Sequence, residues 1–413
     1  MIKMNTTIAA VLVVAMLVVP QTVSQYRAIP IWPEASIHAQ YQVKSTSGDN
    51  IDTVGFWDSA HHWHSIADEE RVITPLSNQQ RYRSTDITKI ADNILLYQKT
   101  NGGWPKNYDM LAILTEEQKR ALKKARMDAN TTFDNGATHS QVEYLSKAYS
   151  IAKDERYKDA CLRGLDFILA AQYANGGWPQ CYPDSSGYRR YITFNDGAMI
   201  GVMNALHHIV QDKPYYAFVD RARRDQVRRA FAKGLDCILK CQIVQNGRPT
   251  AWCQQHDDVD YRPRAARTFE PAAVCGGESA EIVLFLMSID HPTGEVIASV
   301  QSAVKWFNDS KVRGIRVQKV KAPTTQFVYH TADFDRVVVR DPKAPPIWAR
   351  LYELGTNAPL FCNRDGKPVY SLADVDRERR TGYEWYTYAP EQALKKYPSW
   401  QKKWAPSQEV LEE

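Results

Sequence analysis

Apolar residues recur with a helical period along most of the chain from residue 85 to about 310. Ile90, Ile94 and Leu95 recur at spacings of four and five residues, and this run stops before a Gly-Gly turn. Two later runs end in the same way. The three matching segments are 90–98, 164–172 and 234–242. We predict a partner helix after each of them, at 137–152, 197–211 and 277–289. The pattern therefore predicts paired helices that alternate between two roles.

A short motif precedes the first two partner helices. It is Thr-Phe-Asp-Asn-Gly-Ala at 132–137 and Thr-Phe-Asn-Asp-Gly-Ala at 193–198, so the acid and the amide exchange places. A third, less similar copy is Thr-Phe-Glu-Pro at 268–271. Successive copies are some 60 to 75 residues apart, and a Gly-containing turn precedes each copy. Repeats of this kind predict helical hairpins arranged as a closed toroid or a solenoid, with several acidic loops at one end.

The helical period fades after residue 310. The segments 312–331 and 336–352 contain alternating and β-branched residues with several prolines, which predicts short strands and long loops. We expect this part to fold over one mouth of the helical domain, which we place at 81–395. A polar tail is predicted at 396–413.

The N-terminal 80 residues differ in character from the rest. A short basic start, an apolar run at 8–19 and a small-residue stretch predict a secretory signal peptide at 1–25, with an uncleaved anchor as the alternative. Export to the periplasm or the medium follows, without membrane insertion after cleavage. Residues 26–80 are predicted to form an irregular arm. Three histidines cluster in this arm, His61, His62 and His64. Such a cluster is typical of surface residues, and we assign these histidines no functional role.

Composition restricts the function classes. The 413 residues are 44% hydrophobic and 24% charged with a net charge of +5, as in an ordinary globular protein, and a monomer is expected. No lysine-rich block or aromatic-basic motif predicts nucleic-acid binding. The seven cysteines are widely scattered and odd in number, so at least one is unpaired or bonded to another molecule.

The acids of the repeated motif are the first candidates for chemistry. Asp134 and Asp196 each stand beside an Asn and just before a helix, where a capping role is the simplest interpretation. Two such loops directed at one mouth also provide hard oxygen ligands of the kind that Ca²⁺ requires. Near the faded third copy, Arg267 lies in a basic stretch that equally suits a solvated surface.

Arginines are also abundant in the loop-rich C-terminal part, at 350, 364, 377, 379 and 380. The planar guanidinium pairs bidentately with carboxylates, so this cluster suits a polymeric acid as well as a simple charged surface. Four tryptophans in turns or loops, Trp104, Trp178, Trp252 and Trp385, are candidates for stacking on sugar rings, and packing is favoured for the first two. For His256 beside Asp257, a structural polar contact is favoured over an acid-base pair.

At these motifs the chain resembles the pectate lyases of polysaccharide lyase family 10, over about residues 85–390. The matching segments are 90–107, 132–137, 175–182, 192–203, 252–257, 276–279, 348–366 and 379–386. The resemblance implies an (α/α)₃ toroid, in agreement with the repeats. It also implies cleavage of α-1,4-linked polygalacturonate or oligogalacturonides by anti β-elimination with Ca²⁺ as cofactor.

The resemblance also implies roles for single residues. The family's base is an arginine just before an aromatic-Glu pair, and Arg267 matches it, two residues before Phe269. The acids that bind calcium and substrate resemble Asp134 with Asn135, and Asp196. The substrate-binding set is Arg350, Arg364, Glu270 and His256.

The implied β-elimination is physically reasonable, but it requires an arginine to act as a base despite its high pKa. Removal of the C5 proton leaves negative charge on the C6 carboxylate, which a bound Ca²⁺ and arginines would stabilise. The free pKa of arginine is above roughly 12, so we expect crowding by Ca²⁺ and other arginines to lower the pKa of Arg267, and an alkaline optimum.

Departures from the family pattern leave a rival function open. The family usually has a second Asp where this chain has Gly197, and a Tyr where it has Phe269. These changes favour the alternative, a non-catalytic oligogalacturonide-binding protein on the same fold. A glycoside hydrolase is a third interpretation, and it would need two carboxylates flanking the bond.

Overall fold

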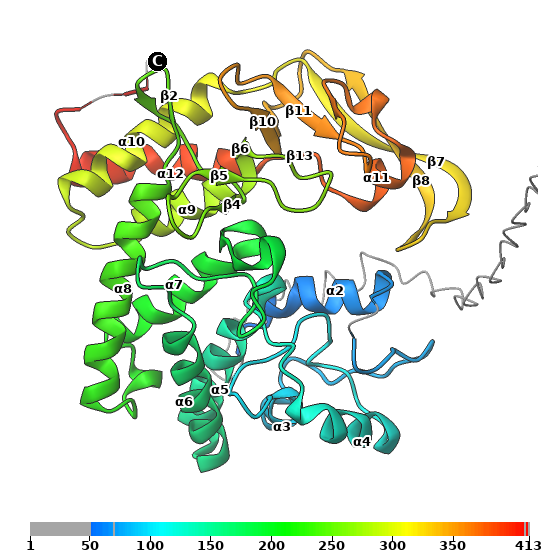
Figure 1. The fold of residues 1–413 in the computed structure, drawn as a ribbon, viewed down its shortest axis with the longest axis vertical. Helices are drawn as coiled ribbons and strands as arrows, with labels where there is room; N and C mark the ends of the chain where they lie inside the picture. Colours follow the sequence, from blue (N-terminus) through cyan, green and yellow to red (C-terminus); the bar gives the residue numbers. More distant parts are fainter. Residues whose placement is uncertain (1–50, 69–70, 409, 412–413) are drawn as a thin grey trace, which may run out of the picture.

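The computed structural model describes residues 51–68, 71–408 and 410–411, and Figure 1 shows how they are arranged. The predicted signal peptide and residues 26–50 lie outside these ranges. Within them, none of the helices has the length and apolar character needed to cross a bilayer.

Long helices carry most of the fold and form two rows. Row A consists of α3 (Ile87–Tyr97), α6 (Glu155–Ala170), α8 (Arg221–Cys241) and α10 (Gly294–Asp309). Row B consists of α5 (His139–Ala152), α7 (Ala198–Val210), α9 (Gly276–Met287) and α12 (Ala389–Trp404). Successive helices contact each other within each row, and α5–α6, α7–α8 and α9–α10 pack as pairs (Figure 1). The predicted alternation between two roles is confirmed.

Glutamines join the helices of row A, and Gln98 is buried while Gln172 and Gln242 are partly buried. Gln98, Gln172 and Gln242 each follow a row A helix by one or two residues, and each side-chain amide donates two hydrogen bonds. One bond goes to a carbonyl of the following turn and the other to a carbonyl of the next row A helix. The acceptors are Gly102 and Ala160 (2.9 and 2.8 Å), Gly176 and Ala230 (3.0 and 2.8 Å), and Thr250 and Ser299 (3.0 and 3.0 Å). The sequence repeat is therefore a repeat of hydrogen bonds.

Tryptophans repeat in the same way. The indoles of Trp104, Trp178 and Trp252 donate to the carbonyls of Ile94, Ile168 and Ile238, at 2.8, 2.9 and 2.8 Å. All three rings are fully buried, and Trp385 is also buried. The packing role predicted for Trp104 and Trp178 is confirmed, and it extends to the other two, so none of the four is available to stack on a sugar ring.

A strand-rich layer lies beside α9, α10 and α12 (Figure 1). Its four-stranded antiparallel sheet has the order β12 (Pro368–Val369), β11 (Pro359–Cys362), β10 (Leu351–Glu353) and β6 (Ala273–Cys275). A three-stranded sheet has the order β1 (Ile192–Thr193), β4 (Gln255–His256) and β5 (Pro263–Arg264). Two further sheets have two strands each. One pairs β9 (Trp348–Ala349) with β13 (Tyr386–Thr387), and the other pairs β2 (Val244–Gln245) with β3 (Arg248–Pro249). The layer has a small apolar core of its own, which includes Phe269 and Tyr383.

One hairpin is longer than the short strands predicted. The strands β7 (Ile315–Gln326) and β8 (Thr331–Arg340) extend from the strand layer toward the N-terminal helix α2 (Trp57–Ser65) (Figure 1). At its tip, the carbonyl of Tyr329 accepts a hydrogen bond from the backbone N–H of Ala67, at 2.7 Å. The hairpin thus bridges the strand layer and the segment that follows α2.

The structure corrects both ends of the predicted domain. The arm was predicted to be irregular, yet 54–65 form a short 3₁₀ turn, η1 (Val54–Phe56), followed by α2, whose Trp63 is fully buried. The polar tail predicted from residue 396 is wrong up to residue 404, because α12 continues through it. Tyr397 and Trp400 of α12 are buried in the main core, since apolar residues recur on one side of this helix.

The remaining short elements are four helical turns, two short helices and the two motif loops. They are α4 (Glu116–Lys124), η2 (Ala125–Met127), η4 (Gly187–Arg190), η6 (Pro214–Tyr216), η7 (Leu372–Asp374), α11 (Arg377–Gly382), η3 (Asp134–Gly136) and η5 (Asn195–Gly197). The faded third motif copy, 268–271, does not form such a loop at a helix start, because β6 separates it from α9. Only two copies are structurally equivalent.

The glutamine bonds carry a testable contribution to stability. Gln98→Ala should lower the free energy of unfolding by about 1–3 kcal/mol for each buried carbonyl left without a donor. Denaturant unfolding followed by circular dichroism measures this. The control is Gln226→Ala in α8, an exposed position, where a change within about 0.5 kcal/mol is expected. Equal effects of the two substitutions would contradict the role given to Gln98.

Candidate functional site

The two motif loops lie against each other at the start of their row B helices. Loop η3 precedes α5, loop η5 precedes α7, and the two loops are in contact. In each loop the second residue has a left-handed backbone, with φ of 51° at Asn135 and 48° at Asp196. Asn and Asp adopt this conformation more readily than other residues with a side chain. The motif thus folds locally, and the helix pairing brings its two copies together.

The swapped order of acid and amide makes the two loops unequal. Asp134 corresponds to Asn195, and both are buried, at 3% and 2% exposed. Asp196 corresponds to Asn135 at the left-handed position. The side chain of Asp196 is 30% exposed, whereas Asn135 is buried at 2%. One acid is therefore enclosed and the other is partly exposed to solvent.

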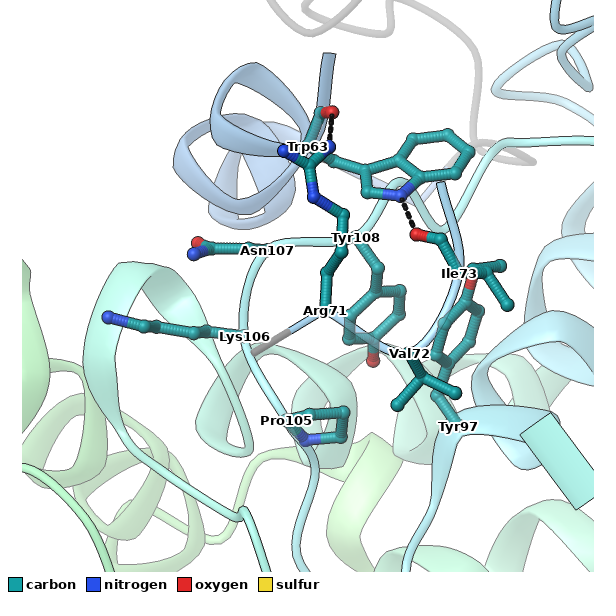
Figure 2. Close-up of a pocket in the computed structure, with 9 residues that line it drawn as sticks. All are labelled: Trp63, Arg71, Val72, Ile73, Tyr97, Pro105, Lys106, Asn107 and Tyr108. Atoms are coloured by element: carbon teal, nitrogen blue, oxygen red, sulfur yellow. Dashed lines mark hydrogen bonds between the residues drawn. The ribbon is translucent and has the colours of Figure 1, made fainter. Parts of the chain in front are cut away.

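Asp134 is held by Lys106, a residue that the sequence did not single out. The Lys106 ammonium lies 2.7 Å from Asp134 Oδ2. Burial works to lower the pKa of Lys106, but Asp134 outweighs burial and raises it, so the ammonium stays charged. Figure 2 shows the side chains of Lys106 and Asn107 extending to the side of their segment away from Tyr97 and Val72, and all four residues line a small pocket.

Several oxygen atoms at the site fit a hard cation. Asp134 Oδ1 and Asn135 Oδ1 are buried, and neither has a hydrogen-bond partner among the described residues. The amide of Asn135 is fixed, because its Nδ2 donates to Asn107 Oδ1 at 2.8 Å. Carboxylate and amide oxygens are the ligands that Ca²⁺ takes. Across the described ranges no three His, Cys, Asp or Glu side chains group closely enough to hold a metal ion.

Arg350 connects loop η5 to helix α9. Its Nη2 donates to Asp196 Oδ1 at 3.2 Å, to Asn195 Oδ1 at 3.1 Å and to Glu278 Oε1 at 2.8 Å. Pairing of β10 with β6 brings this about, because Leu351 is opposite Cys275, the residue before α9. Burial works to lower the pKa of Arg350, but Glu278 and its other anionic neighbours raise it. Arg350 therefore orients Asp196.

Arg267 forms a bidentate ion pair with Glu270. Its Nε donates to Glu270 Oε2 at 2.7 Å and its Nη2 to Oε1 at 2.5 Å, while 44% of its side chain is exposed. Burial works to lower the pKa of Arg267, but the hydrogen bonds and charge of Glu270 outweigh it and raise the pKa. The expected lowering of the pKa by neighbouring arginines is not found, because the nearest charged group is a carboxylate.

A chain of hydrogen bonds joins Arg267 to the motif loops. Beyond Glu270, the Tyr383 hydroxyl donates to Glu270 Oε1 at 3.2 Å and accepts from Gln254 Nε2 at 3.2 Å. The same Gln254 amide reaches Asn195 Oδ1 at 2.7 Å and Glu278 Oε1 at 2.8 Å. Arg267, Arg350 and Asp196 therefore belong to one network. Gln254, Glu278 and Tyr383 were not predicted, since their partners lie far apart in sequence.

The ring of Phe269 makes cation–π contacts with three guanidinium groups. The Cζ atoms of Arg379, Arg267 and Arg364 lie 4.6, 4.8 and 5.2 Å from the ring centroid. Glu378 pairs with both Arg364 and Arg379, with N–O distances of 2.7–2.9 Å. Arg364 remains 40% exposed and is accessible to a ligand. Its side chain also lies 4.7 Å from the Tyr329 ring at the hairpin tip.

His256 and Glu270 do not have the surroundings of substrate-binding residues. His256 is fully buried, its Nε2 accepts from the backbone N–H of Cys253 at 3.0 Å, and its Nδ1 donates to the Tyr261 carbonyl at 2.7 Å. Both ring nitrogens are thus used, and the structural contact is its role. Glu270 is 2% exposed and serves Arg267.

Helix α2 adds two residues that the sequence analysis set aside or missed. The carboxylate of Asp58 has its pKa raised to about 6, first by desolvation and then by the charges of Asp196 and Asp134. His62, one turn later, lies in the field of the same acids, and burial lowers its pKa. His64 is not a surface residue, because it is buried against Asp109 at 3.0 Å. The i, i+4 spacing of Asp58 and His62 was the available signal.

Comparisons with known proteins identify the family to which the chain is similar. A family model described as pectic acid lyase matches residues 98–394. The family 10 polysaccharide lyase from Cellvibrio cellulosa is 30% identical, with a TM-score of 0.64 over 76% of this chain and 92% of that one. A mutant of that lyase in complex with trigalacturonic acid is 30% identical, with a TM-score of 0.63 over 78% and 93% of the two chains. No curated protein matches.

The charge of Asp58 should destabilise the protein at neutral pH. Its folded-state pKa of about 6 lies above the ordinary value of 3.8, so its contribution to stability falls as pH rises through this interval. Asp58→Asn should therefore raise Tm near pH 7.5 in chelator and leave it unchanged below about pH 4. Asp225→Asn, at an acid of α8 outside the site, is the control. An equal Tm shift at both pH values would rule out the electrostatic explanation.

Proposed function

The chain belongs to the pectic acid lyase family, and on that premise we propose that it cleaves α-1,4-linked polygalacturonate by Ca²⁺-assisted anti β-elimination with Arg267 as the base. The chain is a polysaccharide lyase. The identity of its substrate, its base and its cofactor is what we propose. One observation carries it, the network that joins Arg267 to Arg350, Asp196 and Glu278. The trigalacturonic acid named for the solved relative supports the choice of substrate.

Glu270 prepares Arg267 for proton abstraction by fixing two of its three nitrogens. Nε and Nη2 are held by the carboxylate, which leaves Nη1 to face the C5–H bond of the sugar. The proton moves from C5 to Nη1, the electron pair forms the C4–C5 double bond, and the C4–O4 bond breaks. The leaving oxygen takes its proton from water. The product carries an unsaturated uronate at its new non-reducing end.

The raised pKa of Arg267 sets the pH dependence of this step. Only the small deprotonated fraction of the guanidine can accept a proton, and Glu270 makes that fraction smaller. The rate is therefore expected to increase with pH throughout the alkaline range.

Asp134, Asn135 and Asp196 would hold the calcium ion. The oxygens of Asp134 and Asn135 that lack a partner and the half-buried carboxylate of Asp196 are the donors. When bound, Ca²⁺ would neutralise the uronate carboxylate and stabilise the charge that develops next to C5. Lys106 keeps Asp134 in place.

Arg350 and Arg364 have separate tasks in this proposal. Arg350 is mostly buried and already bonded to Asp196 and Glu278, so it positions the acid loop. Arg364 is more exposed and binds a uronate carboxylate, in exchange for part of its contact with Glu378. His256 has no part in substrate binding.

The proposal extends to architecture and location. We propose that the two helix rows close as an (α/α)₃ toroid with the strand layer over one mouth, and that the protein acts as an exported monomer in the periplasm or the medium. The succession of contacts along both rows supports the first statement, and the signal peptide predicted at 1–25 supports export.

One assay separates the lyase from the rival, a non-catalytic oligogalacturonide-binding protein. Polygalacturonate with Ca²⁺ at alkaline pH should yield absorbance from unsaturated uronate. Tight oligogalacturonide binding with no such absorbance would favour the rival.

Arg267→Lys tests the identity of the base. Loss of the positioned base should lower kcat by roughly 10²–10⁴-fold. Because the pKa of lysine is about 10.4, the alkaline limb of the rate profile should move to lower pH if residue 267 takes the proton. Arg262→Ala, at an exposed arginine of the same segment, is the control. A reduced rate with an unshifted pH profile would show that Arg267 acts only through its charge.

Removal of divalent cations should abolish cleavage. Chelator should reduce the absorbance assay to its background, and added CaCl₂ should restore it, while circular dichroism shows that the fold persists. Asp134→Asn should require more Ca²⁺ for half-maximal rate, because the enclosed carboxylate loses one charged oxygen. Full activity in chelator would exclude calcium from the mechanism.

A further inference from the structure

Position 197 has no side chain, and a carboxylate from another element lies in front of it. Gly197 has a left-handed φ of 69°, and a Cβ built on it would lie 3.4 Å from Glu281 Oε2, an ordinary van der Waals contact. Glu281 belongs to helix α9, which contacts loop η5. The carboxylate of Glu281 is therefore placed where a side chain at 197 would extend.

This carboxylate has no partner of its own. Among the described residues, no hydrogen bond or ion pair ends on the Glu281 carboxylate. It is exposed, in contrast to its neighbour Glu278, whose Oε2 is buried without a hydrogen-bond partner and whose side chain is 5% exposed. The charges acting on Glu281 are mainly those of other acids, namely Glu278, Asp196 and Asp58, with Arg350 opposing them. The wall of the site beside Gly197 thus has more carboxylates than cations.

We propose that Glu281 is a ligand of the divalent cation bound at Asp196, and that α9 in this way supplies a carboxylate that position 197 lacks. Two observations support this inference, the approach of Glu281 to Gly197 and the buried oxygen of Glu278 that lacks a partner. It rests on the proposed function, since it concerns the calcium site of the lyase. Water and the uronate carboxylate supply the remaining ligands.

Positions 197 and 281 can direct a carboxylate into the same space. An Asp side chain at 197 would begin 3.4 Å from Glu281 Oε2. The left-handed backbone at 197 is one that Asp tolerates better than most residues. Two substitutions, Glu281→Gln and Gly197→Asp, can therefore move the carboxylate from position 281 to position 197. This double variant tests whether a carboxylate at this place in the site is enough, even when Glu281 is absent.

Calcium binding to the whole chain tests the proposal without an activity assay. CaCl₂ is titrated by calorimetry into the wild type, Glu281→Gln, the double variant Gly197→Asp/Glu281→Gln, and Glu117→Gln, a control at an exposed acid of α4. We expect about tenfold or greater loss of Ca²⁺ affinity in Glu281→Gln. The double variant should recover most of the affinity, and the control should equal the wild type. Circular dichroism verifies that each variant is folded.

The outcomes distinguish this inference from the proposed function. Wild-type affinity in Glu281→Gln would overturn the inference and leave the calcium-dependent lyase intact. Weak binding in both Glu281→Gln and the double variant would also overturn it, since a carboxylate at 197 would then fail to replace Glu281. Failure of the wild type to bind Ca²⁺, alone and with trigalacturonate, would overturn both.

Discussion

Three glutamine side chains, one buried and two partly buried, link the successive helices of row A. Each one donates a hydrogen bond to the turn after its own helix and another to the next helix of row A. A buried carbonyl without a donor is costly, so these bonds fix the stagger between successive hairpins. The stagger in turn decides where each row B helix begins. Loops η3 and η5 meet because they occupy the same place in successive hairpins.

Charge is balanced locally within this framework and leaves a few oxygens without a partner. Every arginine of the site is paired with a carboxylate, Arg267 with Glu270, Arg350 with Glu278, and Arg364 with Glu378. A partly buried guanidinium without a counter-charge would be unfavourable. Acids remain in excess around Asp196, where desolvation and then the charges of Glu278, Asp196 and Asp58 raise the pKa of Glu281. This surplus of negative charge would attract a cation.

Near-symmetry of the repeats produces an asymmetric site. The exchange of acid and amide between the two motif copies buries one carboxylate beside Lys106 and turns the other toward solvent. Identical loops would have placed two carboxylates at equivalent positions, both buried or both exposed. One exchange of neighbouring residues therefore gives the two carboxylates different surroundings.

The sequence by itself determined the helical pairs, the repeat and the motif loops, because local periodicity and turn chemistry specify them and Gln98, Trp104 and their equivalents recur at matching positions. It also indicated Arg267, Asp134 and Asp196 as candidates. Only the tertiary structure decided which groups meet them. Glu278 reaches Arg350 through the pairing of β6 with β10, and Glu281 reaches Gly197 through the packing of α9. It also enclosed His256 and raised the pKa of Arg267. Charges and hydrogen bonds act over a few ångströms in space, and separation along the chain carries no information about such distances.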